Sequence, residues 1–193
     1  MRSSLPKSIT QDEINALPLG AFEGRVYVIS DAAKLPSVLA EIKKEARVGF
    51  DTETKPVFVR GQYNQVALMQ LAIPGKVFLI RLNQTGLPPS LAAFLEDDTI
   101  EKAGVAIRDD IKALQHLRRF QPGGFVELAT LAKEKGLEVE SVKKLTALVL
   151  GFRISKSAQT SNWEAPTLTE KQISYAATDA WVCLEIYNKL KTA

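Results

Sequence analysis

Cysteine and histidine are nearly absent from this 193-residue chain, and their scarcity excludes several kinds of site. Cys183 is the only cysteine, so no disulfide can form within the chain, as is typical of a reducing compartment. It lies in an apolar stretch with helical spacing, so we expect it to pack in the core and not to act as a nucleophile. His116 is the only histidine, which excludes a histidine-rich metal site.

Long apolar runs and dense blocks of charge are also missing. No apolar run approaches the roughly 18 residues of a membrane span, and the first residues lack the apolar region of a secretory signal. The net charge of +3 permits a nucleic-acid partner but does not argue for one. No Walker A, G-x-S-x-G or dinucleotide-binding glycine motif is present. We therefore expect a cytoplasmic protein without a membrane partner.

The composition is that of a globular domain, with 46% hydrophobic and 24% charged residues. A short helical piece, "QDEINAL", precedes Pro18 and Gly20 near the start of the chain. We predict an N-terminal arm over residues 1–20 and one domain over residues 21–193, which is long enough for a sizeable core.

Hydrophobic periodicity predicts an α/β fold with a mixed sheet. The chain from residue 47 to residue 81 reads as three strands in succession, and their short connections imply an antiparallel meander. After Pro122 the chain reads as mostly helical, and Thr169 with Gln172 has the capping-box pattern of a final long helix. The predicted strands cover 25–30, 47–53, 65–73, 76–81 and 100–107, and the helices before the last cover 31–45, 89–97, 109–120, 127–136 and 141–151.

The stretch "VGFDTET" at residues 48–54 breaks the pattern of a buried strand. Alternate side chains of a strand share a face, so Asp51 and Glu53 lie together beside Gly49, opposite Val48 and Phe50. Two carboxylates held this close repel, and burying either one unpaired is costly. A positive partner is therefore expected on this face.

Two further places carry acids where a strand or helix pattern does not need them. Asp109 and Asp110 follow an apolar strand, and a helix cap explains only one of them. Tyr175 and Asp179 are four residues apart on the last helix and therefore share a face. Taken alone, that pair indicates a packed helix with a Tyr–Asp contact, with small residues beside it that allow close approach of another element (Ala176, Ala177 and Ala180).

Taken together, these places supply four carboxylates and one phenol near the end of a strand and two helix faces. Hard oxygen ligands in this number suit Mg²⁺ or Mn²⁺ and not zinc. The positive partner predicted for the strand is therefore a divalent metal site.

The sequence resembles the DEDDy 3′–5′ exonucleases of the ribonuclease H-like superfamily. It is most similar to the Werner-type exonuclease domain and more distantly similar to ribonuclease D. The resemblance covers about residues 25–190 and rests on three motifs in order, with "FVEL" and "SNW" as lesser matches. The three motifs are "FDTE", "KAGVAIRDDIKAL" and "YAATDA".

The resemblance implies a ribonuclease H-like sheet, with a three-strand antiparallel meander followed by parallel strands and with helices on both faces. It implies that two divalent ions, Mg²⁺ or Mn²⁺, are held by four acids: Asp51, Glu53, Asp110 and Asp179. Tyr175 is then expected to orient the attacking water. The implied activity is hydrolysis of phosphodiester bonds from the free 3′ end of DNA or RNA, which releases nucleoside 5′-monophosphates.

The chain departs from the Werner-type pattern at two places. The second motif offers adjacent acids where that pattern has one, and alignment on Gly104 and Leu114 selects Asp110. Asp109 is then a cap or a surface charge. Thr54 stands where the Werner-type pattern has tryptophan, so contacts with the substrate end are expected to differ.

Candidate substrate contacts lie in the connection after the acidic strand. Arg60 can reach a phosphate, and Phe58 or Tyr63 can stack on a terminal base. The alternative is that these residues only build a hairpin around Gly61. Weaker candidates are Arg153 and Lys156, and Trp163 is expected to be a packing residue.

Two rival functions remain beside the metal-dependent exonuclease. The first is a nucleic-acid-binding module with the same fold but little catalytic activity, which should show a replaced carboxylate; none of the expected acids is replaced. The second is an interaction domain whose acids form ordinary salt bridges. A protein partner such as a helicase is left open by the sequence.

Overall fold

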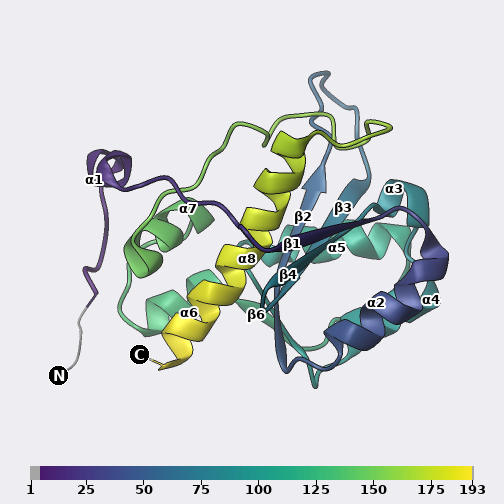
Figure 1. Cartoon of the computed structure of the whole chain (residues 1–193), viewed down its shortest axis with the longest axis horizontal. Helices are drawn as coiled ribbons and strands as arrows, with labels where there is room; N and C mark the ends of the chain where they lie inside the picture. Colours follow the sequence, from purple (N-terminus) through teal and green to yellow (C-terminus); the bar gives the residue numbers. More distant parts are fainter. Residues whose placement is uncertain (1–4, 193) are drawn as a thin grey trace.

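A computed structural model describes residues 5–192 and places a six-stranded sheet at the centre of the chain (Figure 1). The strand order is β1-β4-β3-β2-β5-β6. The strands are β1 (Arg25–Ile29), β2 (Arg47–Thr54), β3 (Val66–Ile73), β4 (Lys76–Ile80), β5 (Glu101–Gly104) and β6 (Phe125–Glu127).

The sheet is mixed, as predicted. Strands β2, β3 and β4 form an antiparallel meander, and β1 joins β4 in parallel at one edge. On the other side β5 pairs in parallel with β2, and β6 pairs in parallel with β5. In this register Asp51 of β2 lies directly opposite Gln70 of β3.

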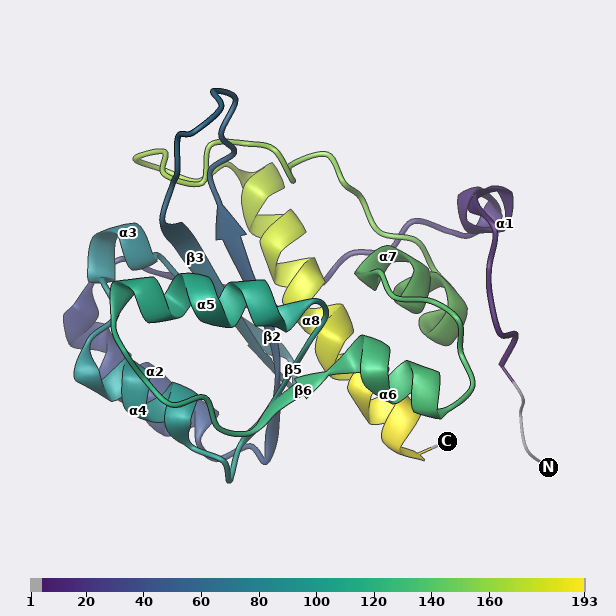
Figure 2. The ribbon, with the colours of Figure 1, turned by 180° about the vertical axis from the view of Figure 1, so that it is seen from behind.

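Helices cover both faces of the sheet (Figures 1 and 2). The apolar side chains of α2, α4 and α5 pack with Val48 and Phe50 on one face. Helix α8 covers the other face, where its alanines pack against β3 and β4. The helical elements are α1 (Gln11–Ala16), η1 (Ala32–Lys34), α2 (Leu35–Ile42), α3 (Leu82–Thr85), α4 (Pro89–Glu96), α5 (Ile107–Leu117), α6 (Leu128–Glu134), α7 (Val142–Leu145), the π-helical turn η2 (Thr146–Leu150) and α8 (Glu170–Thr192).

The sequence pattern explains the packing of helix α2 and the start of helix α8. Helix α2 buries the four predicted apolar positions on one stripe: Leu35, Val38, Leu39 and Ile42. The amide of Thr169 donates to the Gln172 side chain at 3.0 Å, and the amide of Gln172 donates to the Thr169 hydroxyl at 3.2 Å. The predicted capping box before α8 is thereby confirmed.

The predictions were wrong at two boundaries that border the site. Strand β5 ends at Gly104, and α5 begins at Ile107, because Ala106 between them adopts a left-handed conformation with φ of 55°. The strand β6 was not predicted at all. Its three residues are too short to show an alternating pattern, and only pairing with β5 defines it.

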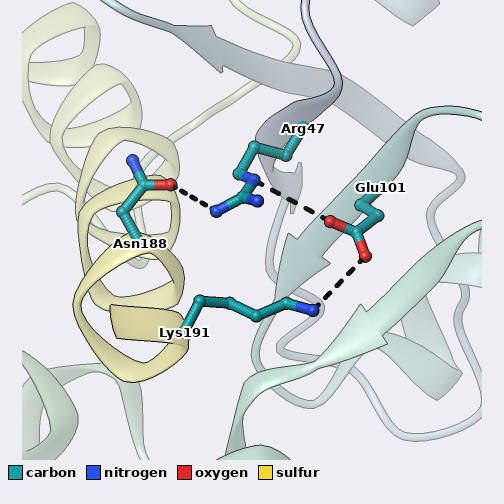
Figure 3. A network of polar contacts seen from close by, with 4 residues as sticks. All are labelled: Arg47, Glu101, Asn188 and Lys191. Atoms are coloured by element: carbon teal, nitrogen blue, oxygen red, sulfur yellow. Dashed lines mark hydrogen bonds and ion pairs between the residues drawn. The ribbon is translucent and has the colours of Figure 1, made fainter. Parts of the chain in front are cut away.

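A polar network fixes the C-terminal part of α8 to the strand starts, opposite the acidic end of β2 (Figure 3). The Arg47 guanidinium lies 3.8 Å from the Glu101 carboxylate and donates to the Asn188 side chain at 3.2 Å. Lys191 approaches the same Glu101 at 3.9 Å. The network therefore links the C-terminal part of α8 to the starts of β2 and β5.

No helix within residues 5–192 is both long enough and apolar enough to cross a membrane.

Candidate active site

Three carboxylates meet at the C-terminal end of β2. Asp51, Glu53 and Asp179 each place an oxygen within 4.8 Å of the other two. Asp51 and Glu53 lie on the face of β2 that α8 covers, and Asp179 comes from α8 itself. Glu53 and Asp179 are buried, with 8% and 5% of their surface exposed, so this charge is concentrated away from solvent.

A glycine brings α8 close enough to complete this cluster. A Cβ built on Gly49 would lie 1.9 Å from the carbonyl oxygen of Ala180 and 2.9 Å from the amide nitrogen of Leu184. The backbone of α8 therefore lies directly on β2, which requires small residues on both elements. Ala180 directly follows Asp179, so the same contact brings the Asp179 carboxylate close to β2.

The fourth acid, Asp110, approaches from the other face of the sheet. It lies in the first turns of α5, and its Oδ1 accepts a hydrogen bond from the hydroxyl of Thr52. Its charge raises the pKa of both Asp51 and Glu53, which places it beside the cluster. Asp109 is exposed and is a surface charge and not the cap, because the N-cap position of α5 is Ala106.

Glu127 positions the start of α5, and the sequence analysis did not assign it a role. Its carboxylate accepts hydrogen bonds from the amides of Ala106 at 3.0 Å and Ile107 at 2.9 Å. It also accepts from the amide of Ala129 at 3.2 Å, so one side chain caps both α5 and α6. The signal was present in "FVEL", where an acid directly precedes a helix, but its partner at the distant α5 is visible only in the fold.

Gln70 is a second supporting residue that sequence reasoning missed. It is fully buried opposite Asp51, and its amide nitrogen lies 3.4 Å from Oε1 of Glu53, to which it donates. Its own carbonyl oxygen has no hydrogen-bond partner among the described residues. The available signal was a polar residue in the middle of the apolar "VALMQLAI", since a buried glutamine side chain requires hydrogen-bond partners.

Tyr175 joins the cluster through Asp179. It lies one helical turn before Asp179 on α8, and burial together with the Asp179 carboxylate raises the pKa of its phenol. The ring of Trp163 lies 5.9 Å from the Tyr175 ring, and Trp163 is fully buried, so it is the predicted packing residue. The tyrosine is thus held between a packed indole and a carboxylate.

The electrostatics of the site are those of buried carboxylates that repel one another. Burial, reinforced by the neighbouring carboxylates, raises the pKa of Asp51 well above its ordinary value and that of Glu53 to about 9. Burial raises the pKa of Asp179 to about 7 and that of Asp110 to about 6. Every other charge that acts on Asp51 and Glu53 is itself a carboxylate, so this cluster is not a set of ordinary salt bridges.

A cavity of about 380 Å³ opens beside Asp51. Cys183 reaches its wall but is only 2% exposed, and burial raises the pKa of its thiol, as expected for a core residue. The other lining residues are Val105, Ala106, Glu140, Ser141 and Val142.

The predicted substrate contacts lie outside the acidic cluster. Phe58 and Arg60 are exposed on the hairpin between β2 and β3, and Lys156 is exposed on the connection before α8. Arg153 donates to the carbonyl of Leu17 at 3.0 Å and so holds the N-terminal segment.

Comparison with known proteins agrees with this geometry. The sequence profile of a family described as 3′–5′ exonuclease matches residues 26–193. The chain belongs to this family of 3′–5′ exonucleases. Its acidic site fits divalent metal ions, because the ligands are oxygens, their mutual repulsion has no other relief, and the Gln70 carbonyl beside them is unsatisfied.

This exonuclease domain is similar to parts of larger proteins. It is 35% identical over 199 residues to the bifunctional 3′–5′ exonuclease/ATP-dependent helicase WRN of Mus musculus, with 98% of the chain and 14% of that protein covered. It is 36% identical over 161 residues to the exonuclease 3′–5′ domain-containing protein 2 of Drosophila melanogaster, with 79% of the chain and 27% of that protein covered. The chain thus spans about a quarter or less of either relative.

Solved structures share the fold. The exonuclease domain of Nibbler from Aedes aegypti superposes with a TM-score of 0.78 at 28% identity, over 92% of both chains. RNase D of Escherichia coli, described as an exoribonuclease involved in structured RNA processing, gives a TM-score of 0.78 at 27% identity, over 87% of this chain and 44% of that one. The ribonuclease H-like arrangement expected from the motifs is therefore confirmed.

Proposed function

We propose that this domain hydrolyses phosphodiester bonds from the 3′ end of a nucleic acid and releases nucleoside 5′-monophosphates. The observation that carries the proposal is the meeting of Asp51, Glu53 and Asp179 within 4.8 Å, with Tyr175 one helical turn before Asp179 on α8. A nucleic-acid-binding module without catalysis would not require carboxylates that repel one another in a buried site.

Four acids are proposed to hold two divalent ions, Mg²⁺ or Mn²⁺: Asp51, Glu53, Asp179 and Asp110. When bound, such ions supply an activated water and stabilise the charge that develops on the phosphate and the leaving oxygen. Gln70 holds the Glu53 carboxylate, and Thr52 holds that of Asp110. These contacts keep the ligands near one geometry before the substrate arrives.

Tyr175 is proposed to orient the attacking water. Its hydroxyl lies at the edge of the cluster, and the half-buried ring is held by Trp163. Burial, with the neighbouring carboxylates, raises the pKa of this phenol, so it remains a protonated hydrogen-bond group at neutral pH. A neutral hydroxyl positions water without adding charge to the site.

The test uses matched single strands of DNA and RNA labelled at the 5′ end, and duplexes with a recessed 3′ end, in Mg²⁺, Mn²⁺ or chelator. The expected product is a ladder that shortens from the 3′ side in either metal and is absent in chelator. A 3′-phosphate should slow the reaction, because it adds bulk and charge where a hydroxyl should sit. The Asp51→Asn variant should be inactive on every substrate.

Two outcomes contradict the proposal. Cleavage of a closed circle would indicate an endonuclease. Early release of labelled mononucleotide from the 5′-labelled strand would indicate the opposite polarity. Comparison of the DNA and RNA strands assigns the preferred sugar.

A further inference from the structure

The hairpin between β2 and β3, residues 55–65, concentrates exposed apolar surface. Seven large hydrophobic side chains are exposed among residues 5–192, and four of them lie on this hairpin. Phe58 is 86% exposed, Tyr63 65%, Val59 56% and Val57 39%. A concentration of exposed apolar side chains on one short loop is typical of an interaction site.

The hairpin is positively charged. It carries Lys55 and Arg60 and no acidic residue, and Arg60 is exposed at the tip. The hairpin follows the acidic strand directly in the sequence, since only Thr54 separates Glu53 from Lys55. Exposed rings interleaved with cations match a strand that offers flat bases and phosphates.

Hydrogen bonds hold the base of the hairpin in place. The Asn64 amide donates to the carbonyls of Lys55 at 2.9 Å and Pro56 at 3.4 Å, which closes the neck. The Tyr63 hydroxyl lies 2.5 Å from Nδ1 of His116 on α5, and their rings are 5.9 Å apart. The exposed side chains of the tip are therefore presented on an ordered support.

The position of the hairpin suits a strand that enters the acidic site. It extends beyond the end of β2, and the connection that leads into α8 runs beside it in both views (Figures 1 and 2). A strand with its 3′ end at Asp51 and Glu53 would pass these segments over its last few nucleotides.

We propose that this hairpin binds the unpaired nucleotides next to the 3′ end, with Phe58 stacking on a base and Arg60 contacting a phosphate. The inference deepens the proposed exonuclease function and rests on it. Bases stack on a single ring face only when they are free of a partner strand, so the hairpin selects single-stranded ends over fully paired ones. A protein partner is the less favoured occupant, because the hairpin directly follows the acidic strand and its only charged side chains are cations.

Binding is measured by fluorescence anisotropy with a labelled single-stranded oligonucleotide, with Asp51→Asn in every protein so that the strand stays intact. Phe58→Ala should weaken binding by about 5- to 150-fold, the range for loss of one stacked base, and Phe58→Trp should restore it. Arg60→Ala should reduce the slope of log K against log salt concentration by about 0.7, the value for one phosphate contact on a single strand.

The control is Tyr27→Ala, because Tyr27 is 38% exposed on the distant edge strand β1 and should not affect binding. In proteins that retain Asp51, Phe58→Ala should raise KM for a single strand more than it lowers kcat, and the otherwise unsubstituted protein should hydrolyse bis(p-nitrophenyl) phosphate. That small diester tests the chemistry alone.

Unchanged affinity in Phe58→Ala and Arg60→Ala, or equal losses for an unpaired strand and a blunt duplex, would overturn the inference. No binding of any strand by the Asp51→Asn protein would overturn it as well. Failure of the otherwise unsubstituted protein to hydrolyse either the diester or the strand would instead contradict the proposed function, so the two failures are distinguishable.

Discussion

Gly49 of β2 faces the carbonyl oxygen of Ala180 on α8 so closely that a Cβ would lie 1.9 Å from it. Real Cβ atoms do not approach an oxygen at this distance, so a side chain at residue 49 would push the helix away. The contact links the first and last motifs, because Asp51 lies two residues after Gly49 and Asp179 directly before Ala180.

We predict that Gly49→Ala loses most nuclease activity and destabilises the fold by about 1–3 kcal/mol, the usual cost of overpacking. Displacement of α8 would separate Asp179 from the strand acids. Denaturant unfolding and strand degradation measure the two effects. The control is Gly75→Ala in the turn between β3 and β4, where nothing lies within 4 Å but φ is 75°. That variant should lose about 1 kcal/mol of stability and retain activity, and retained activity in Gly49→Ala would contradict the prediction.

Asp110 and Asp109 should differ sharply. Asp110 is half-buried and held by Thr52 beside the cluster, whereas Asp109 is exposed. Asp110→Ala should therefore abolish turnover, and Asp109→Ala should retain most of it, in the same strand-degradation assay. The reverse pattern would mean that the second motif is aligned wrongly by one residue.

Tyr175 separates positioning of water from metal binding. Tyr175→Phe keeps the ring that packs on Trp163 and removes only the hydroxyl. We expect kcat to fall by about 10²–10⁴-fold, the range for positioning and acid–base contributions, while the midpoint for Mn²⁺ stays nearly unchanged. Tyr187→Phe is the matched control, because it removes a hydroxyl from the same helix. That hydroxyl lies near Glu101 and away from the acidic cluster. Loss of Mn²⁺ binding in Tyr175→Phe would assign the tyrosine a structural role.

Much of the site was predictable from sequence because its signals are local. The alternation of β2 puts Asp51 and Glu53 on one face, and helical spacing pairs Tyr175 with Asp179. Glu127 was not predictable as a support for Asp110, because its hydrogen bonds join residues some twenty positions apart. The early start of α5 depends on the same contact, together with the left-handed Ala106. Long-range capping has no periodic signature, which is why motif reasoning found the four acids and missed their supports.

Glu127 should act on turnover through the position of Asp110. Glu127→Ala removes the acceptor of three amides and should cost about 1–2 kcal/mol of stability, the upper range for a cap. We also expect a higher Mn²⁺ midpoint, because Asp110 loses its fixed helix start. Glu13→Ala is the matched control, since Glu13 serves the capping box of α1 and should affect stability without affecting metal binding. An unchanged Mn²⁺ midpoint at equal loss of stability in the two variants would exclude the positioning role.

The acidic cluster also predicts how stability depends on pH and metal. Folding raises the pKa values of Asp110 to about 6, Asp179 to about 7 and Glu53 to about 9, so the folded protein binds more protons than the unfolded chain over this range. Their contribution to the free energy of unfolding of the metal-free protein should therefore be complete below about pH 4 and be lost as the pH rises from about 4 to about 9.

Mn²⁺ should reverse this loss, because it binds the deprotonated carboxylates. A Mn²⁺ concentration 100-fold above Kd should add about 2.7 kcal/mol to the free energy of unfolding. Because more of the carboxylates are deprotonated at pH 8 than at pH 5, the rise in Tm on adding Mn²⁺ should be larger at pH 8. Asp51→Asn removes one of the mutually repelling charges, so its Tm without metal should decline less with pH and its response to Mn²⁺ should be weaker. Thermal unfolding of both proteins at pH 5 and pH 8, with Mn²⁺ or with chelator, measures these changes in Tm. A Tm that is independent of Mn²⁺ at pH 8 would contradict a preformed metal site.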